Sequence, residues 1–259
     1  MDDAVNPILE DYLHYERINA REPGFKRINN GQTVKYISDD GAGAYITAFL
    51  GKPEQLADAI EAEKSYFRQR QTNFEWKTYA CDGLDTLEDL LMAAGFQPEE
   101  EEAFMVMDLE QLPAYTGPVE AVKITTPEGI DDVIAVEEAV WDRSFSNFKT
   151  YLLNQLQNQP DYQSLYVSYQ DGKPVATARI TFTPGSPFAG LWGGSTLKEF
   201  RGLGHYRSLL HARAEEARLQ GVKYLTLDAS DMSEPIVTQL GFDKLTTTRP
   251  YHFHFKDAE

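Results

Sequence analysis

The residues best suited to bind a ligand lie in one glycine-rich stretch, Gly193–Leu210. A predicted strand ends near Leu197, a turn containing Gly202 and Gly204 follows, and an amphipathic helix begins at His205. Successive backbone N–H groups in such a turn form an anion site, and the helix N-terminus adds partial positive charge. Glycine lets phosphate oxygens approach the main chain. The pattern favours a pyrophosphate-containing ligand, although it also suits an ordinary tight strand-to-helix connection.

The charge around this turn differs from that of the whole chain. The 259 residues have a formal net charge of −17, which repels polyanions and argues against nucleic-acid binding. The segment from Leu197 to Lys223 instead holds six Lys or Arg and three Asp or Glu. A locally positive segment suits an anionic ligand, and the acidic remainder favours a cationic partner such as an amine.

The elements that must position this turn follow an α/β pattern. The helix after the turn carries an apolar stripe of Leu203, Tyr206, Leu210, Ala214 and Ala217, which predicts packing against a sheet. The other elements expected in this half are listed in chain order: strand 119–125, helices 128–139 and 148–157, strands 164–169, 174–182 and 188–197, helix 205–219, strand 223–228, helix 233–240 and a strand within 251–255.

The N-terminal half repeats a similar order of elements. We expect helices over 6–20, 53–70 and 84–94, with strands over 33–38, 43–50, 74–79 and 103–109. The short helices of the two halves end alike, in Met92-Ala-Ala-Gly-Phe96 and Thr238-Gln-Leu-Gly-Phe242. Prolines and a glycine mark a linker. The predicted organisation is a duplication with domains 1–112 and 120–259 joined by linker 113–119.

The turn and its neighbours together resemble one family. Arg201-Gly-Leu-Gly204 is similar to the pyrophosphate-binding motif of GNAT-type N-acetyltransferases, Arg/Gln-x-x-Gly-x-Gly/Ala, and the flanking strands and helices follow that family's order. The resemblance covers roughly residues 120 to 255. It implies a mixed, mostly antiparallel twisted sheet flanked by helices. The N-terminal half, with only Gly51-Lys52 between its strand and helix, resembles a degenerate GNAT-like domain without a cofactor site.

The resemblance also implies a reaction and a set of contacts. The protein would transfer acetyl from acetyl-CoA to a small-molecule or peptidyl amine by direct attack, without a metal. The alternative is a weak or inactive acyl-CoA-binding regulatory module. The residues expected to bind the cofactor are Ser195, Thr196 and Leu197 on the strand, and Arg201, Gly202, Leu203, Gly204, His205, Tyr206 and Arg207 at the turn.

Two positions depart from the family pattern. Tyr206 replaces the last Gly/Ala of the motif and narrows the space beside the phosphates. Val237 stands where many members carry a tyrosine that protonates the departing thiolate. Ser233 is the candidate replacement, and Asp228 is the candidate base. Each also has a structural interpretation, Ser233 as a helix N-cap and Asp228 as a turn or helix-start residue.

The remaining candidates have simpler interpretations beside the functional ones. Trp141, Phe145 and Trp192 either line a substrate pocket or pack in the core. His252 and His254 share a strand face, which suits a surface pair better than a metal site. A single cysteine, no signal-like N-terminus and no long apolar run favour a cytoplasmic protein that does not cross a membrane.

Overall fold

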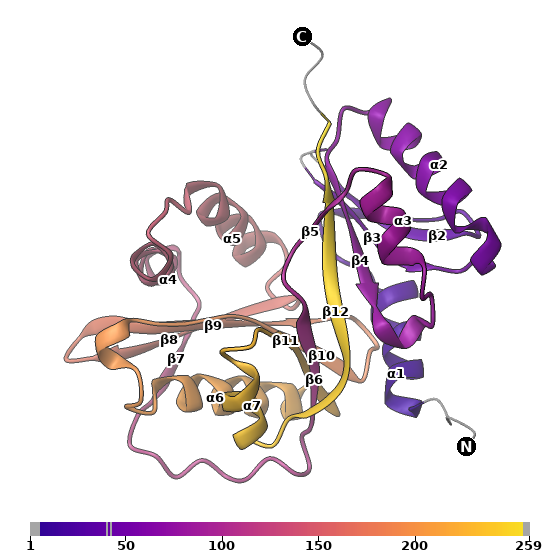
Figure 1. The fold of residues 1–259 in the computed structure, drawn as a ribbon. Coiled ribbons are helices and arrows are strands. Elements are labelled where there is room, and N and C mark those ends of the chain that lie inside the picture. Colours follow the sequence, from indigo (N-terminus) through magenta and orange to yellow (C-terminus); the bar gives the residue numbers. More distant parts are fainter. Residues whose placement is uncertain (1–5, 40, 42, 256–259) are drawn as a thin grey trace. The chain divides into compact units, whose positions relative to one another are not determined.

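The computed structural model describes residues 6–39, 41 and 43–255, and these form two compact units. Unit 1 contains the described residues up to Met105 and those from Asp228 onward, and unit 2 is Val106–Leu227. The chain leaves unit 1 within β6 (Glu102–Asp108) and returns to it within β11 (Tyr224–Ala229) (Figure 1). The predicted domains, 1–112 and 120–259, have other boundaries than these two units. The duplication that they imply stays a prediction.

Unit 1 begins with a helix and a three-stranded meander. Helix α1 (Pro7–Tyr12) starts after Asn6, whose side chain accepts a hydrogen bond from the Ile8 N–H, and continues as a π-helical segment, Leu13–Ile18. Strands β1 (Phe25–Asn29), β2 (Thr33–Ser38) and β3 (Ala44–Phe49) then pair antiparallel in chain order. The sequence analysis missed β1, because its two charged residues hide the period-two pattern of a short strand.

The rest of unit 1 adds helices and further strands beside the meander. Helix α2 (Leu56–Arg68) connects β3 to β4 (Phe74–Tyr79), which pairs parallel to β3, and α3 (Leu87–Ala93) and the short β5 (Gln97–Pro98) follow. The returning chain supplies α7 (Glu234–Gln239) and β12 (Asp243–Phe253), and β12 pairs antiparallel with β4. A core of aromatic and aliphatic residues that includes Phe67, Trp76 and Tyr251 fills the space between sheet and helices.

Strand β12 is longer than the predicted 251–255. Its first residues, Asp243 to Pro250, are mostly polar, so they carried no strand pattern. Pairing explains the last part of this stretch, because Thr248 to Pro250 lie opposite Tyr79 to Lys77 of β4, far away in sequence. A strand specified by a distant partner is hidden from local patterns.

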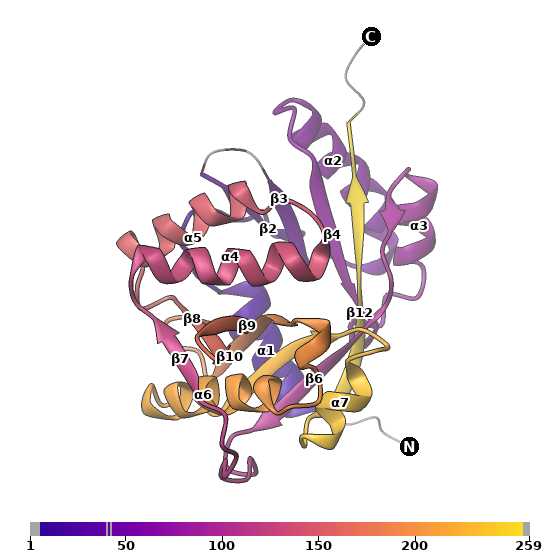
Figure 2. The same ribbon diagram turned by 90° about the vertical axis from the view of Figure 1, so that its left-hand side faces the viewer.

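Unit 2 is a sheet with helices on both faces. Its strand order is β7-β8-β9-β10-β11, where β7 is Ala121–Ile124, β8 Gln163–Gln170, β9 Lys173–Phe182 and β10 Phe188–Thr196. The pairs are antiparallel except the last, in which β10 runs parallel to β11. Helices α4 (Pro127–Trp141) and α5 (Ser146–Asn158) cover one face, and α6 (His205–Leu219) covers the other (Figures 1 and 2).

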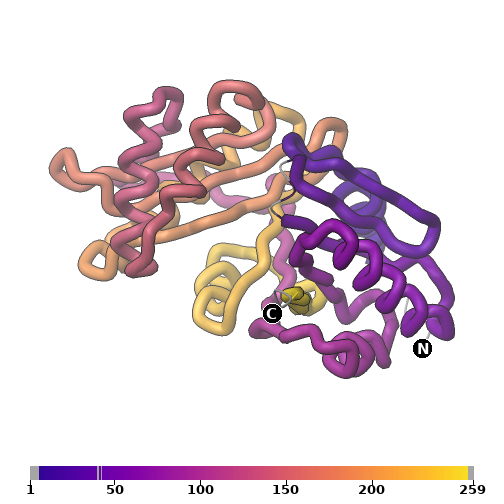
Figure 3. The backbone as a smooth tube through the Cα atoms, turned by 90° about the horizontal axis from the view of Figure 1, so that it is seen from above, coloured from indigo at the N-terminus to yellow at the C-terminus, as the bar shows by residue number. Residues whose placement is uncertain are grey.

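Helix α4 is held on the sheet by its apolar face. Thr126 caps its N-terminus by accepting a hydrogen bond from the Gly129 N–H, and Pro127 occupies the first turn. Ile130, Val133 and Ile134 are buried against Leu165 and Val167 of β8. Seen from above, α4 and α5 lie across the strands of this unit (Figure 3). The predicted mixed α/β fold, mostly antiparallel and flanked by helices, is confirmed.

Candidate active site

The glycine turn between β10 and α6 has a backbone that only glycine adopts readily. Gly202 and Gly204 have φ angles of 78° and 96°, in the left-handed region that carries a steric cost for other residues. A Cβ added at Gly202 would meet no atom within 4 Å. The glycine is therefore required there for its backbone conformation and not for lack of space.

The N-terminus of α6 has no side-chain cap. Gly204 occupies the N-cap and has no side chain to bond the first N–H groups, and the first turn contains no acidic residue. In uncapped first turns the amide groups remain available to a ligand. Arg201 is exposed, and its Nε donates to the Thr196 carbonyl at 3.2 Å.

Two side chains of the predicted cofactor set lie differently from expectation. Leu203 is 57% exposed, so it does not belong to the buried stripe that Leu210, Ala214 and Ala217 form; the left-handed Gly204 breaks the helical period between them. The Tyr206 ring lies against Gly194, where an added Cβ would stand 2.8 Å from a ring carbon. A glycine at position 194 is what gives this large ring its room.

His205 directs its imidazole into the protein. The side chain is 1% exposed, Nδ1 is 2.8 Å from the Ser168 hydroxyl oxygen, and burial lowers the imidazole pKa below its ordinary value. The ring is therefore neutral at physiological pH. Any phosphate contact from this position comes from the backbone N–H.

Strand β10 changes its pairing along its length. It pairs with β11 over Phe188–Gly190, while its pairing with β9 continues to Thr196 through a register shift between Trp192 and Ser195. A bulge of this kind bends a strand and leaves residues without ladder partners. Gly193 lies within this bulge, with φ at 57°.

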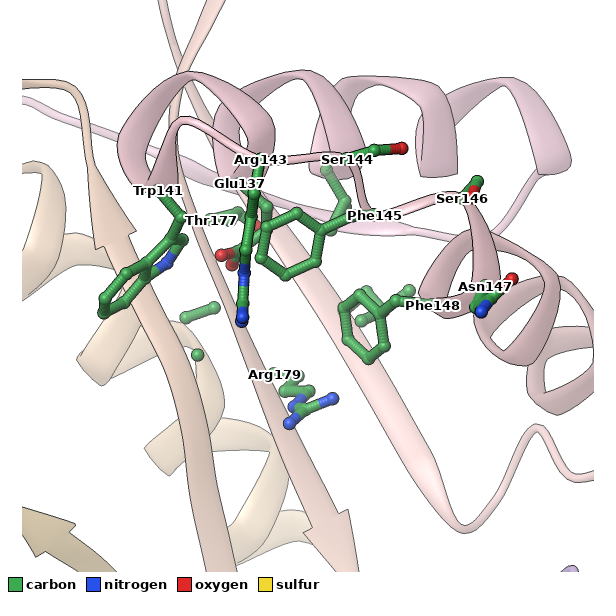
Figure 4. Close-up of a pocket in the computed structure, with 14 residues that line it drawn as sticks. Glu137, Trp141, Arg143, Ser144, Phe145, Ser146, Asn147, Phe148, Thr177 and Arg179 are labelled. Carbon is green, nitrogen blue, oxygen red and sulfur yellow. The ribbon is translucent and has the colours of Figure 1, made fainter. Parts of the chain in front are cut away.

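A pocket of about 510 Å³ opens beside this bulge, on the face of the sheet that α4 and α5 cover (Figure 4). Volumes of this size suit small-molecule ligands. Its walls come from α4, the loop to α5, the first turn of α5 and strands β8 to β10. The lining residues include Glu137, Trp141, Arg143, Phe145, Phe148, Thr177, Arg179 and Gly193. Of the two interpretations of Trp141 and Phe145, pocket lining or core packing, the structure thus agrees with pocket lining.

Glu137 is the acidic residue of the pocket lining, and the sequence analysis missed it. The residue is 6% exposed, and its Oε2 accepts a hydrogen bond from the Ser195 hydroxyl at 3.0 Å. The Trp141 indole N–H donates in turn to the Ser195 oxygen at 3.3 Å. Oε1 lies on the other side, near Gly193, where an added Cβ would stand 3.5 Å from it. The carboxylate is therefore held against the bulge of β10.

Burial raises the pKa of Glu137 above its ordinary value. The Ser195 hydrogen bond and the charges of Arg179 and Arg143 act in the opposite direction and offset only part of this effect. A carboxylate whose pKa moves toward neutrality is a better proton acceptor at physiological pH than an exposed one. The signal was present in the sequence, because Glu137 falls seven residues after Ile130 on the apolar stripe of α4.

Trp192 does not belong to the pocket lining. It is exposed, and its indole N–H donates to the Thr181 hydroxyl at 2.9 Å. The other two aromatic candidates, Trp141 and Phe145, differ from it because they lie at the end of α4 and in the following loop.

The two predicted catalytic residues lie in unit 1. Asp228 pairs with Lys77 and accepts a hydrogen bond from the Thr248 hydroxyl at 3.1 Å. Ser233 occupies the N-cap position of α7, but its side chain makes no capping hydrogen bond and contacts Ser230 instead, at 3.2 Å. Val237 is 1% exposed and packs in the core. The catalytic roles of Asp228 and Ser233 stay predictions.

The histidine pair on β12 has a local partner. His252 Nε2 is 2.9 Å from Glu99 Oε1, and the rings of His252 and His254 stack with centroids 6.1 Å apart. Among the described residues, no group of three or more His, Cys, Asp or Glu is arranged to hold a metal ion. Nor does any helix in the described part of the chain have the length and apolar character needed to span a membrane.

Comparisons with known proteins concern the family and the fold of this chain. Residues 133–242 match the model of the acetyltransferase (GNAT) family. A GCN5-related N-acetyltransferase from Kribbella flavida superposes with a TM-score of 0.68 at 18% identity, over 90% of this chain and 91% of that one. A tandem GNAT protein from the clavulanic acid biosynthesis pathway gives 0.62 at 14% identity, over 97% and 88%. A search of curated proteins found no match.

A third solved structure, a GCN5-related N-acetyltransferase from Sphaerobacter thermophilus, has a TM-score of 0.60 at 16% identity, over 95% of this chain and 84% of that one. The fold of nearly the whole chain is thus that of GNAT proteins, including a tandem one. Residues 133–242 are a domain of the GNAT acetyltransferase family. The matched range begins at Val133, within α4, and ends at Phe242, directly after α7.

Proposed function

We propose that this protein is an N-acyltransferase that moves an acetyl group from acetyl-CoA to an amine bound in the 510 Å³ pocket. The observation that carries the proposal is the position of Glu137, a buried carboxylate held between the pocket and the bulge of β10. The glycine turn at Arg201–Tyr206 supports binding of the CoA pyrophosphate, because its N–H groups and the start of α6 favour an anion.

The reaction follows from these groups. An amine enters the pocket as its ammonium form, and Glu137 accepts one proton from it. The neutral nitrogen attacks the thioester carbonyl and forms the C–N bond of a tetrahedral intermediate in which the nitrogen is cationic. This nitrogen releases a second proton, and the C–S bond breaks as the intermediate collapses to the neutral amide. The CoA thiolate takes up a proton, for which Ser233 or water is the proposed source. The step needs no covalent enzyme intermediate and gains most from holding amine and thioester together.

One observation favours a second function. Val237 is a buried apolar residue at the position where a tyrosine would serve as the acid, so a CoA-binding module with little turnover is the alternative. Thiols have pKa values near about 8.5, and solvent can therefore protonate a departing thiolate. For this reason we favour the enzyme.

The experiment is release of free CoA thiol from acetyl-CoA in the presence of a panel of small amines. Amine-dependent release that is lost in Glu137→Gln supports the proposal. Saturable CoA binding in calorimetry without release for any amine supports the regulatory module. The Glu128→Gln variant is the matched control, because Glu128 is an exposed carboxylate on the same helix.

A further inference from the structure

An exposed tryptophan borders the pocket one helical turn after Glu137. Trp141 is 60% exposed, although its indole N–H donates to the Ser195 hydroxyl at 3.3 Å. The polar end of this side chain is therefore bonded within the site, while most of its apolar surface remains open to solvent. A large apolar surface that is held in place gains free energy when a ligand covers it.

Two phenylalanines continue the aromatic lining. Phe145 and Phe148 are partly buried, and their ring centroids lie 6.0 Å apart at an interplanar angle of 66°. Both pack against the apolar core between α4 and the sheet. The main chain at Phe145 is fixed as well, because its N–H donates to Glu138 Oε1 at 2.9 Å. The aromatic side of the pocket is thus formed before a ligand binds.

The aromatic rings and the carboxylate border the same space. Figure 4 shows the rings of Trp141, Phe145 and Phe148 around the region that the Glu137 carboxylate faces. Because Glu137 and Trp141 both hydrogen-bond to Ser195, at 3.0 and 3.3 Å, the carboxylate and the indole are close neighbours. A ligand that contacts both needs a cationic group and an apolar ring separated by a short chain.

The charged residues of the lining favour one cationic group and not two. Among the described residues that line the pocket, Glu137 is the only carboxylate, and Arg143 and Arg179 are the cations. Glu137 balances one ammonium group. A second ammonium group on the same molecule would lie among positive charges without a carboxylate of its own, which is unfavourable in a partly enclosed space.

The two arginines also leave the main ring contact to Trp141. Arg143 Cζ is 4.8 Å from the centroid of the Phe145 ring, and Arg179 Cζ is 4.8 Å from that of Phe148. Each guanidinium therefore stands over one face of a phenylalanine ring. The exposed indole of Trp141 is the larger surface for a ligand.

We infer that the acceptor is an arylalkyl monoamine, whose ammonium group binds at Glu137 and whose ring packs on Trp141. The inference rests on the proposed function and names the substrate class of the same site. The closeness of carboxylate and indole suits a chain of one or two carbons between nitrogen and ring. The net charge of −17 attracts such a cation to the protein, and the aromatic lining then selects among amines.

The test compares 2-phenylethylamine with ethanolamine, which share a two-carbon chain and differ in the group at its end. Both are measured as acceptors in CoA release and as ligands in calorimetry. We expect kcat/KM to be at least about tenfold higher for 2-phenylethylamine, because its ring loses apolar contact with water. Trp141→Ala should lower the ratio of the two kcat/KM values by about 5-fold to 20-fold, whereas Trp141→Phe, which keeps a ring, retains most of it.

This ratio is the decisive quantity, because a general loss of activity cancels in it. Loss of the indole hydrogen bond to Ser195 cancels too, since both Trp141 variants share it. Trp192→Ala is the matched control: Trp192 is an exposed tryptophan of β10 outside the lining, and its N–H also bonds to a hydroxyl, that of Thr181. We expect it to keep the wild-type ratio.

Pentylamine and 1,5-diaminopentane test the charge of the acceptor. The two molecules share a five-carbon chain, and the diamine adds a second ammonium group. We expect pentylamine to have the higher kcat/KM, because the lining holds one carboxylate and two arginines. A diamine that reacts better than pentylamine overturns the restriction to monoamines.

Failure of the inference is distinguishable from failure of the proposed function. CoA release with a ratio that Trp141→Ala leaves unchanged, or that Trp192→Ala lowers equally, overturns the aromatic site and leaves the acyltransferase. If no amine releases CoA, yet 2-phenylethylamine binds more weakly to Trp141→Ala than to wild type, the aromatic site is preserved and the acyltransferase is overturned. Ethanolamine that binds and reacts as well as 2-phenylethylamine overturns the inference directly.

Discussion

The Ser195 hydroxyl donates a hydrogen bond to Glu137 Oε2 across 3.0 Å, and this contact joins the strand of the expected thioester site to the helix of the pocket. Because the Trp141 indole donates to the same hydroxyl oxygen, the single Ser195 proton is directed at Glu137. The carboxylate is held in one orientation by a group that stabilises its ionised form.

Replacing Glu137 by glutamine removes the proton acceptor but keeps the shape of the side chain. We expect kcat to fall by roughly 10²–10⁴-fold, the usual contribution of a general base, while CoA affinity stays within about twofold. Steady-state kinetics beside calorimetry of CoA binding check this. An active Glu137→Gln enzyme would exclude Glu137 as the base and return attention to Asp228.

The pH dependence of activity follows from the direction of the Glu137 pKa. Burial raises that pKa, and the base acts only when ionised, so kcat/KM falls with decreasing pH at a point above the ordinary glutamate value of about 4.3. A profile of kcat/KM between pH 4.5 and 9 locates this limb. A limb that persists unchanged in Glu137→Gln would belong to another group.

The same shift makes a prediction about stability. A carboxyl whose pKa is raised by folding binds more protons in the folded state than in the unfolded state between the two pKa values. Its contribution to the free energy of unfolding therefore declines as the pH rises from about 4.3 through the raised pKa. Glu137→Gln removes this decline. Melting temperatures at pH 5 and pH 8 should show the variant gaining relative to wild type at the higher pH.

The glycine turn is tested at Gly204. We expect Gly204→Asp to weaken acetyl-CoA binding at least about tenfold, or roughly 1.4 kcal/mol, because a carboxylate would stand against the pyrophosphate. Gly204 has φ 96°, so any side chain adds strain. Gly204→Asn carries the same shape without the charge and separates the two effects. Equal affinities for the two variants in calorimetry would remove the electrostatic argument.

The proposed role of Ser233 as proton donor can be tested separately from a role in helix capping. Its side chain makes no capping bond to α7, so Ser233→Ala should change the free energy of unfolding by less than the ~1 kcal/mol of a true N-cap. A fall in kcat with a nearly unchanged melting temperature and CoA affinity supports it as the proton donor. Full activity assigns the proton to water.

The ion pair between Asp228 and Lys77 indicates a structural role for Asp228. Lys77 and Asp228 form an ion pair in which both side chains are largely buried, and removing one member of such a pair costs about 3–5 kcal/mol. We expect Asp228→Asn to lower the melting temperature clearly, whereas the exposed Asp243→Asn does not. Measured well below both melting temperatures, an unchanged kcat shows that Asp228 acts only in stability.

Local patterns predicted the strongly periodic elements well and the distant partnerships poorly. Strand β2 was predicted at its observed bounds, Thr33–Ser38, because its β-branched and aromatic residues form a continuous run between turns. Thr248 to Pro250 of β12 were missed because their strand partner, β4, is far away in sequence. The glycine turn could be predicted because a left-handed backbone conformation favours glycine, and Gly202 and Gly204 both have this conformation.

Only some of the pocket residues were predicted from the sequence, again because local patterns do not show distant contacts. Trp141 and Phe145 attracted notice as aromatic residues, but the role of Glu137 depends on its burial against β10, which no run of letters around Val136-Glu-Glu138 displays directly. A carboxylate on the apolar stripe of a helix was the available sign. Arg179 lies within a strand, where alternation alone does not say which cavity its side chain enters.

The division of unit 1 into two separate stretches of chain has a consequence during protein synthesis. Strand β4 emerges from the ribosome early, but β12, which pairs with it, is made only after the whole of unit 2. At roughly 5–20 residues per second the delay is about 10 to 30 s. During this time the β12-facing edge of β4 lacks that partner, and an unpaired edge is a site for pairing with other chains. A nascent chain stalled before residue 243 should therefore depend on chaperones more than the finished protein does.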